Sequence, residues 1–131
     1  MIYLDTSVAL AHLFGEERAP PPGMWREPLA ASRLLAYEVW NRLHSRGLTH
    51  SHSEAAKLLL AFVSLIDLAP PVLARALEPF PSPIGTLDGL HIATIEYLRS
   101  RGEQIELASY DQKLIICART LGIAIHPLSA G

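Results

Sequence analysis

The stretch Met1-Ile2-Tyr3-Leu4-Asp5-Thr6-Ser7 decides how the chain is organised. Its first four residues are bulky and apolar or aromatic, and a short run of this kind is typical of a buried parallel strand. Asp5 then falls just beyond the carboxyl end of that strand, where open α/β sheets bind their ligands. One acid after one strand is weak evidence of a site, so the position of the other acids becomes the question.

Length and composition favour one domain over residues 1–131. Half of the chain is hydrophobic and 18% is charged, a balance that excludes disorder and allows a substantial core. A net charge of −2 gives no global attraction for nucleic acid, so such binding would need a local basic patch or a cation in an acidic cleft. The single cysteine, the lack of a signal-like N-terminus and the short apolar runs lead us to expect a cytoplasmic protein.

Strands and helices are expected to alternate along the chain. Apolar periodicity predicts helices over residues 8–14, 33–46, 51–65, 72–77, 87–101 and 111–121. Short apolar runs predict strands over residues 1–4, 29–31, 66–69, 104–109 and 123–125. Ser7, Ser32 and Thr86 are expected to cap helices, as is the capping-box spacing of Ser51-His52-Ser53-Glu54. Residues 16–28 are rich in proline and are expected to form a mobile loop. The alternation predicts a parallel sheet with helices on both faces.

Three of the four aspartates lie where a predicted element starts or ends. Asp5 follows the first strand, Asp88 lies in the first turn of the longest helix, and Asp111 follows the fourth strand. Glu38 lies in the second turn of its helix, beside an apolar stripe, where an unpaired carboxylate is costly. Taken singly, the two later aspartates could be ordinary helix caps and Glu38 a solvated helix acid. Taken together they favour a site, because carboxylates gathered at one sheet edge repel one another unless a cation such as Mg²⁺ or Mn²⁺ neutralises them.

The order and spacing of these motifs resemble the PIN-domain endoribonucleases, most closely the VapC-type toxins of toxin–antitoxin pairs. The similar segments span nearly the whole chain: Tyr3-Leu4-Asp5-Thr6-Ser7, Ser32 to Glu38, Thr86-Leu87-Asp88-Gly89-Leu90-His91-Ile92-Ala93, Ser109-Tyr110-Asp111 and Leu121-Gly122-Ile123. The chain departs from the family pattern in two places. Residues 19–23 are rich in proline where a longer helix is common, and Gly89 stands where the family often has alanine.

The resemblance implies a three-layer α/β/α sandwich with a central parallel sheet, and metal-dependent hydrolysis of RNA. It implies an acidic site for Mg²⁺ or Mn²⁺ made by Asp5, Glu38, Asp88 and Asp111. Asp5 and Asp88 are expected to bind the metal directly, whereas Glu38 and Asp111 could bind it, hold it through water or orient the nucleophile. Thr6 and Ser109 are expected to hold these carboxylates through their hydroxyls.

Further expectations concern substrate and partners. Arg42 and Lys113 are candidate RNA contacts, with surface ion pairs as the alternative. His91 is expected to be a packing histidine rather than a ligand, because hard cations prefer oxygen. The resemblance implies a homodimer and a VapB-type antitoxin that covers the site. The apolar residues 58–66 and the proline-rich loop with Trp25 could supply the antitoxin groove, and ordinary core burial would also explain residues 58–66.

Three other functions stay open at this point. A phosphatase or phosphotransferase with Asp5 as nucleophile usually needs a second acid two residues later, where this chain has Ser7. A module that uses the fold only for binding would not need all four acids. A nuclease outside any toxin pair, acting on DNA or another nucleic acid, also fits, because the acids do not report on the sugar.

Overall fold

The computed structural model describes residues 1–129, and their strands form one sheet in which every neighbouring pair is parallel. The strand order is β3-β2-β1-β4-β5. The strands are β1 (Ile2–Leu4), β2 (Leu29–Ser32), β3 (Val63–Ile66), β4 (Glu106–Ala108) and β5 (Ala124–Ile125).

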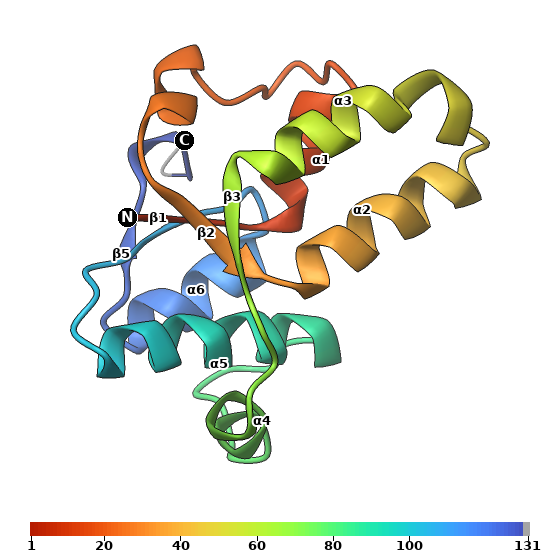
Figure 1. The fold of residues 1–131 in the computed structure, drawn as a ribbon. Coiled ribbons are helices and arrows are strands. Elements are labelled where there is room, and N and C mark those ends of the chain that lie inside the picture. The colour runs from red at the N-terminus through yellow and green to blue at the C-terminus, as the bar shows by residue number, and fades with distance from the viewer. Residues whose placement is uncertain (130–131) are drawn as a thin grey trace.

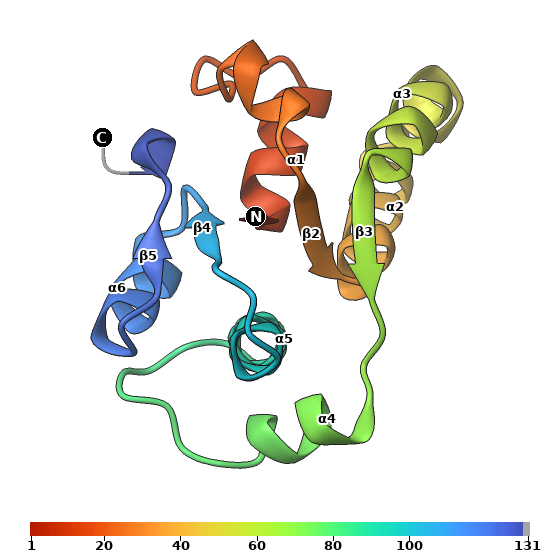
Figure 2. The same ribbon diagram turned by 60° about the vertical axis from the view of Figure 1, so that its left-hand side comes forward.

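Helices cover both faces of this sheet, which gives the predicted three-layer α/β/α sandwich. Figures 1 and 2 show the first three helices on one side of the sheet and the last three on the other. The α-helices are α1 (Thr6–Leu13), α2 (Leu34–Ser45), α3 (Thr49–Ala61), α4 (Pro70–Ala76), α5 (Thr86–Ser100) and α6 (Gln112–Thr120). None of the helices within residues 1–129 combines the length and apolar character that a membrane span needs.

The central strand β1 fixes where the site lies. All three of its residues are buried, as expected for a strand covered by helices on both faces. Leu4 pairs in register with Ala108 of β4, and the backbone N–H of Asp5 donates to the Ala108 carbonyl at 3.0 Å. Asp5 and Ser109, which follow these two strands, therefore leave the sheet side by side at its carboxyl edge.

The periodicity predicted a helix that continues to residue 65, but the apolar residues 58–66 do not form one helix. Helix α3 ends at Ala61, and Val63 starts β3, whose residues pair with β2 from Leu29↔Val63 onward. The predicted strand over residues 66–69 is therefore wrong by three residues. Val63 packs into the core through this pairing, and an apolar run cannot reveal such a pairing on its own.

Three predicted caps are also wrong. Asp5, and not Ser7, is the N-cap of α1. Helix α5 begins at Thr86 itself, and Gly85 occupies its N-cap position without a side-chain cap. Helix α3 begins at Thr49, so Ser51 lies inside it and donates to the Leu48 carbonyl at 3.2 Å. Ser32 does accept a hydrogen bond from the Leu34 N–H at 3.1 Å, although Arg33 occupies the N-cap position of α2.

The proline-rich segment contains one short helical turn, the most that its prolines allow. Residues Pro22–Arg26 form a 3₁₀ helix, η1, which proline at its first position allows. Met24 of this turn is 2% exposed and packs in the core, while Trp25 lies against the core from outside. The segment therefore forms one wall of the fold beside α1.

Candidate metal-binding site

The four predicted acids line one open cavity of about 320 Å³ at the carboxyl edge of the sheet. They come from four different places in the fold: the end of β1, the middle of α2, the first turn of α5 and the N-cap of α6. The acids are Asp5, Glu38, Asp88 and Asp111. The convergence that the sheet topology predicted therefore occurs.

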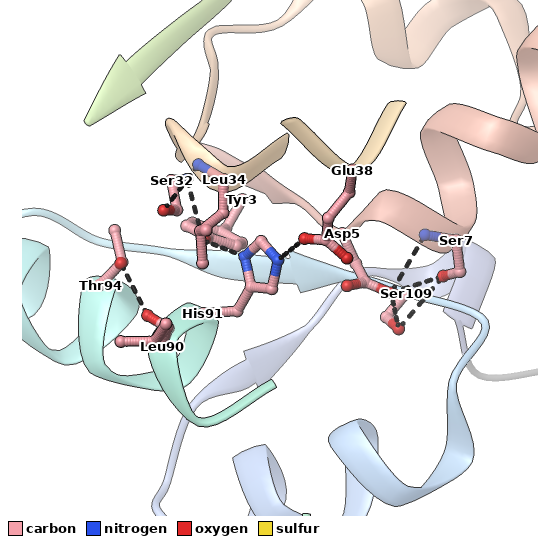
Figure 3. Close-up of polar contacts among 10 residues, drawn as sticks. All are labelled: Tyr3, Asp5, Ser7, Ser32, Leu34, Glu38, Leu90, His91, Thr94 and Ser109. Carbon is pink, nitrogen blue, oxygen red and sulfur yellow. Dashed lines mark hydrogen bonds and ion pairs between the residues drawn. The ribbon is translucent and has the colours of Figure 1, made fainter. Parts of the chain in front are cut away.

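Asp5 is held through one of its two carboxylate oxygens. Its Oδ2 accepts hydrogen bonds from the Ser7 hydroxyl at 2.6 Å, the Ser109 hydroxyl at 2.8 Å and the Ser7 N–H at 3.3 Å (Figure 3). Within residues 1–129, Oδ1 accepts no such bond. The side chain is thus fixed in orientation while one oxygen stays available to a ligand.

Ser7, and not Thr6, is the hydroxyl that supports Asp5. Thr6 lines the cavity, but its Oγ1 has no hydrogen-bond partner within residues 1–129, so the expected supporting role is wrong for it. Ser7 Oγ donates to Asp5 and accepts from the Tyr110 N–H at 3.0 Å. Ser109 does make the expected hydrogen bond with Asp5. Recognising Asp5 as the N-cap would have identified Ser7, because an N-cap side chain meets the residue two positions on.

Asp88 is the acid that its surroundings perturb most clearly. Burial raises its pKa to about 6, and the nearby negative charges of Asp111, Asp5 and Glu38 add to the rise, against the opposing effect of His91. The carboxylates are therefore close enough to repel one another, and a cation among them would relieve that repulsion.

Asp111 has a structural contact in addition to its place in the cavity. Its Oδ1 accepts hydrogen bonds from the backbone N–H groups of Lys113 at 3.0 Å and Leu114 at 3.3 Å, which caps α6. Its own N–H donates to the Ser109 hydroxyl at 2.9 Å. Asp111 therefore caps α6 and also lines the cavity, and its role at a metal stays a prediction.

Glu38 accepts a hydrogen bond from a buried histidine that the sequence did not connect with it. The Oε1 atom of Glu38 lies 2.6 Å from Nε2 of His91, whose side chain is 1% exposed. Burial lowers the pKa of His91, but the hydrogen bond with Glu38 and the charges of Asp5, Glu38 and Asp88 outweigh it, so the pKa is raised overall. His91 is a core histidine, as expected, and it also contacts the site.

Three arginines form a basic rim around the acids. Arg18, Arg42 and Arg46 line the same cavity. The guanidinium of Arg18 lies 4.8 Å from the centre of the Tyr110 ring, and that of Arg46 lies 4.5 Å from the centre of the Phe14 ring. Of the two candidate RNA contacts, Arg42 is thus at the cavity, whereas Lys113 is not among its lining residues.

The donor chemistry of the cavity fits a hard divalent cation. Four carboxylates meet there, and oxygen ligands are those that Mg²⁺ and Mn²⁺ prefer. As arranged, no three or more Asp, Glu, His or Cys side chains within residues 1–129 form a ready-made cation site. A cation would therefore have to draw the carboxylates closer together.

Comparisons with known proteins show the family to which the chain belongs. The family model described as PIN domain matches residues 2–120. Ribonuclease VapC46 of Mycobacterium tuberculosis is 30% identical over 128 residues, which is 95% of each chain. Ribonuclease VapC47 of the same species is 27% identical over 129 residues, or 93% of each chain.

Two solved structures share the fold. A toxin–antitoxin complex from Klebsiella pneumoniae gives a TM-score of 0.67 at 14% identity, over 97% of this chain and 98% of that one. Mycobacterium tuberculosis VapC20, described as a sarcin–ricin loop cleaving toxin, gives 0.61 at 20% identity, over 88% of this chain and 94% of that one. The chain therefore belongs to the PIN-domain family of VapC-type proteins.

Proposed function

We propose that this protein is a metal-dependent endoribonuclease and the toxin of a toxin–antitoxin pair. The observation that carries the proposal is the meeting of four carboxylates from four elements in one cavity with an arginine rim. The names of its relatives support it, since two are called ribonucleases and one structural neighbour comes from a toxin–antitoxin complex.

We infer that Asp5 and Asp88 bind Mg²⁺ or Mn²⁺ directly. The metal, when bound, supplies positive charge against the negative charge that develops on the phosphate and lowers the pKa of a water. Ser7 and Ser109 keep Asp5 oriented with Oδ1 free, so that the carboxylate is ready for a ligand. Glu38 and Asp111 complete the acidic shell, either as ligands or by accepting a hydrogen bond from the attacking water.

The arginine rim would bind the RNA backbone on either side of the acids. Arginine forms charge-assisted hydrogen bonds with phosphate, and the negative charge of the carboxylates would otherwise repel the substrate. The guanidinium groups of Arg18 and Arg46, which lie over the Tyr110 and Phe14 rings, would offer planar surfaces on which unpaired bases can stack. Lys113 would meet only RNA that extends past the cavity.

Cleavage of RNA by the purified protein tests this function. Antitoxin-free protein incubated with total RNA and Mg²⁺ or Mn²⁺ is expected to produce discrete fragments, and chelation of the metal should stop the reaction. The Asp5→Asn variant should be inactive under the same conditions. Equal cleavage by wild type, variant and chelated protein would reject the proposal.

We also infer a VapB-type antitoxin and a homodimer. Leu58 on α3 and Phe62 at its C-cap are 64% and 59% exposed and lie one turn apart, which supports an apolar partner surface there. A second exposed pair is formed by Leu73 on α4 and Leu77 at its C-cap. Light scattering on the isolated protein should give twice the mass of one chain, and a monomer would reject the homodimer.

A further inference from the structure

We propose that His91 and Tyr3 are positioning residues that hold Glu38 in the cavity through a buried chain of hydrogen bonds. The inference rests on the proposed function, because the position of Glu38 matters only if that acid takes part in it. The Ser32 N–H donates to the Tyr3 hydroxyl at 2.9 Å, and that hydroxyl lies 2.7 Å from Nδ1 of His91. The His91 Nε2 atom reaches Oε1 of Glu38 at 2.6 Å (Figure 3).

The direction of this chain is fixed at Glu38. An ionised carboxylate only accepts hydrogen bonds, so Nε2 of His91 must carry a hydrogen whether the ring is neutral or charged. At the other end the Tyr3 oxygen accepts from the Ser32 N–H, and the Tyr3 hydroxyl donates to Nδ1 of a neutral His91 ring or accepts from Nδ1 of a charged one. The backbone of β2 is thus connected to Glu38 through two side chains with every contact satisfied.

Burial makes the chain rigid. Ser32 and Tyr3 are 0% exposed and His91 is 1% exposed, and they come from β2, β1 and α5. Glu38, with its side chain 20% exposed, is the one member that reaches the cavity. A glutamate on a helix surface samples many rotamers, and the contact with a fixed imidazole selects those that keep it over the site.

Two consequences follow for the chemistry of the site. Because Oε1 of Glu38 is occupied by His91, Oε2 is the oxygen left for a metal ion or water. Both ring nitrogens of His91 are engaged, one by Tyr3 and the other by Glu38, so His91 has no lone pair to offer a cation. Helix α5 also carries Asp88 one turn before His91, so a single helix places one acid directly and a second through its histidine.

Binding of Mn²⁺ by calorimetry separates positioning from mere packing. In His91→Leu the donor to Glu38 is lost, and we expect Mn²⁺ affinity to fall by about 10- to 100-fold. The amide of His91→Gln can still donate to Glu38, so this variant should regain much of the loss. Tyr3→Phe should have a smaller effect and serves if His91→Leu fails to fold. Ile95→Val, a buried change on the same helix that removes no hydrogen bond of the chain and does not line the cavity, should leave the affinity unchanged.

A double-mutant cycle with Glu38→Gln completes the test. If His91 acts through Glu38, His91→Leu and Tyr3→Phe should have little further effect on Mn²⁺ affinity in that background. Equal losses in both backgrounds, or His91→Leu protein that binds Mn²⁺ as wild type does, would overturn the positioning role alone. If wild type binds no Mn²⁺, or Asp5→Asn binds it equally well, the proposed function fails and this role fails with it.

Discussion

Two acids of the site also cap helices, and this decides what a substitution at each can report. Asp5 caps α1 and Asp111 caps α6, each through its side-chain oxygen. Alanine would remove the charge and the cap together. Asparagine is about as good an N-cap as aspartate, so it removes the charge and keeps the cap.

Asp5→Asn is therefore expected to abolish RNA cleavage while the protein stays folded. The amide oxygen can still accept from the Ser7 N–H, so the free energy of unfolding should change by no more than about 1 kcal/mol. Urea unfolding and the cleavage assay on the same preparation test this. A variant that unfolds would mean that Asp5 is mainly a structural cap.

The raised pKa of Asp88 predicts a pH-dependent stability in metal-free protein. Its pKa rises from 3.8 to about 6, so the folded state binds this proton more tightly than the unfolded chain does. The stabilisation is complete below pH 3.8 and is lost as the pH rises through about 6. Asp88→Asn should then be more stable than wild type at about pH 8, by about 1 kcal/mol once solvent screening of this half-exposed group is allowed for.

The measurement is urea unfolding in the presence of a chelator at two pH values. The advantage of Asp88→Asn should shrink between about pH 8 and about pH 4.5, because the wild-type carboxyl becomes protonated in the folded state. An advantage of equal size at both values would show that burial and repulsion at Asp88 are not its cause.

At the scale of elements, helix α5 explains one departure from the family pattern. A Cβ atom on Gly89 would lie 3.2 Å from Cε2 of Phe80, a ring that is partly buried in the loop before the helix. Arg75 covers the same ring at 4.4 Å from its centre. Glycine at this position therefore accommodates the loop of residues 78–85, which packs Phe80 on α5.

Gly89→Ala tests this explanation by comparing two backgrounds. Alanine gains up to about 1 kcal/mol of helix propensity, but in wild type it must displace Phe80. We expect almost the full gain in a Phe80→Ala background and a clearly smaller one in wild type. Equal gains in urea unfolding would mean that Phe80 does not determine the choice of glycine.

The elements that the sequence predicted well are those with local signals. Asp111 starts α6 and Gly47 follows α2 with φ +67°, a conformation that glycine adopts at little cost. The end of α3 was predicted wrongly because residues 58–66 are apolar throughout, and only the pairing of β3 with β2 decides where helix gives way to strand. The support of Asp5 was assigned to Thr6 and not to Ser7 because the helix was predicted to start two residues too late. A shift of two residues changes which hydroxyl faces Asp5.

At the scale of the whole molecule, topology made the acidic site predictable. The carboxyl ends of parallel strands share one edge, so acids that follow different strands meet there. The contact of His91 with Glu38 was not predictable, because it depends on how α5 and α2 face each other across the sheet edge. The arginine rim could not be predicted for a similar reason. Arg18 lies in a loop and Arg46 directly after a helix, and no motif connects them.

The rim predicts a substrate-binding effect distinct from that of the acids. Arg18→Ala and Arg46→Ala should each raise KM for RNA several-fold with little change in kcat, because they contact the backbone away from the reacting phosphate. Each should also reduce the salt dependence of log KM by about 0.7, as expected for the loss of one phosphate contact on a single strand. Arg101→Ala, whose guanidinium packs on Tyr97 outside the cavity, is the matched control. Effects of equal size in the control would reject the rim as an RNA contact.

The central claim, that carboxylate-bound metal directs water onto an RNA phosphate, is tested most directly by cleavage in ¹⁸O-labelled water. Mass spectrometry of the products should find one ¹⁸O atom in a linear terminal phosphate, with Mg²⁺ or Mn²⁺ present and with none formed by Asp5→Asn. Attack by the neighbouring 2′-hydroxyl would instead leave an unlabelled 2′,3′-cyclic phosphate. That product, formed equally by the wild type and Asp5→Asn, would contradict the account.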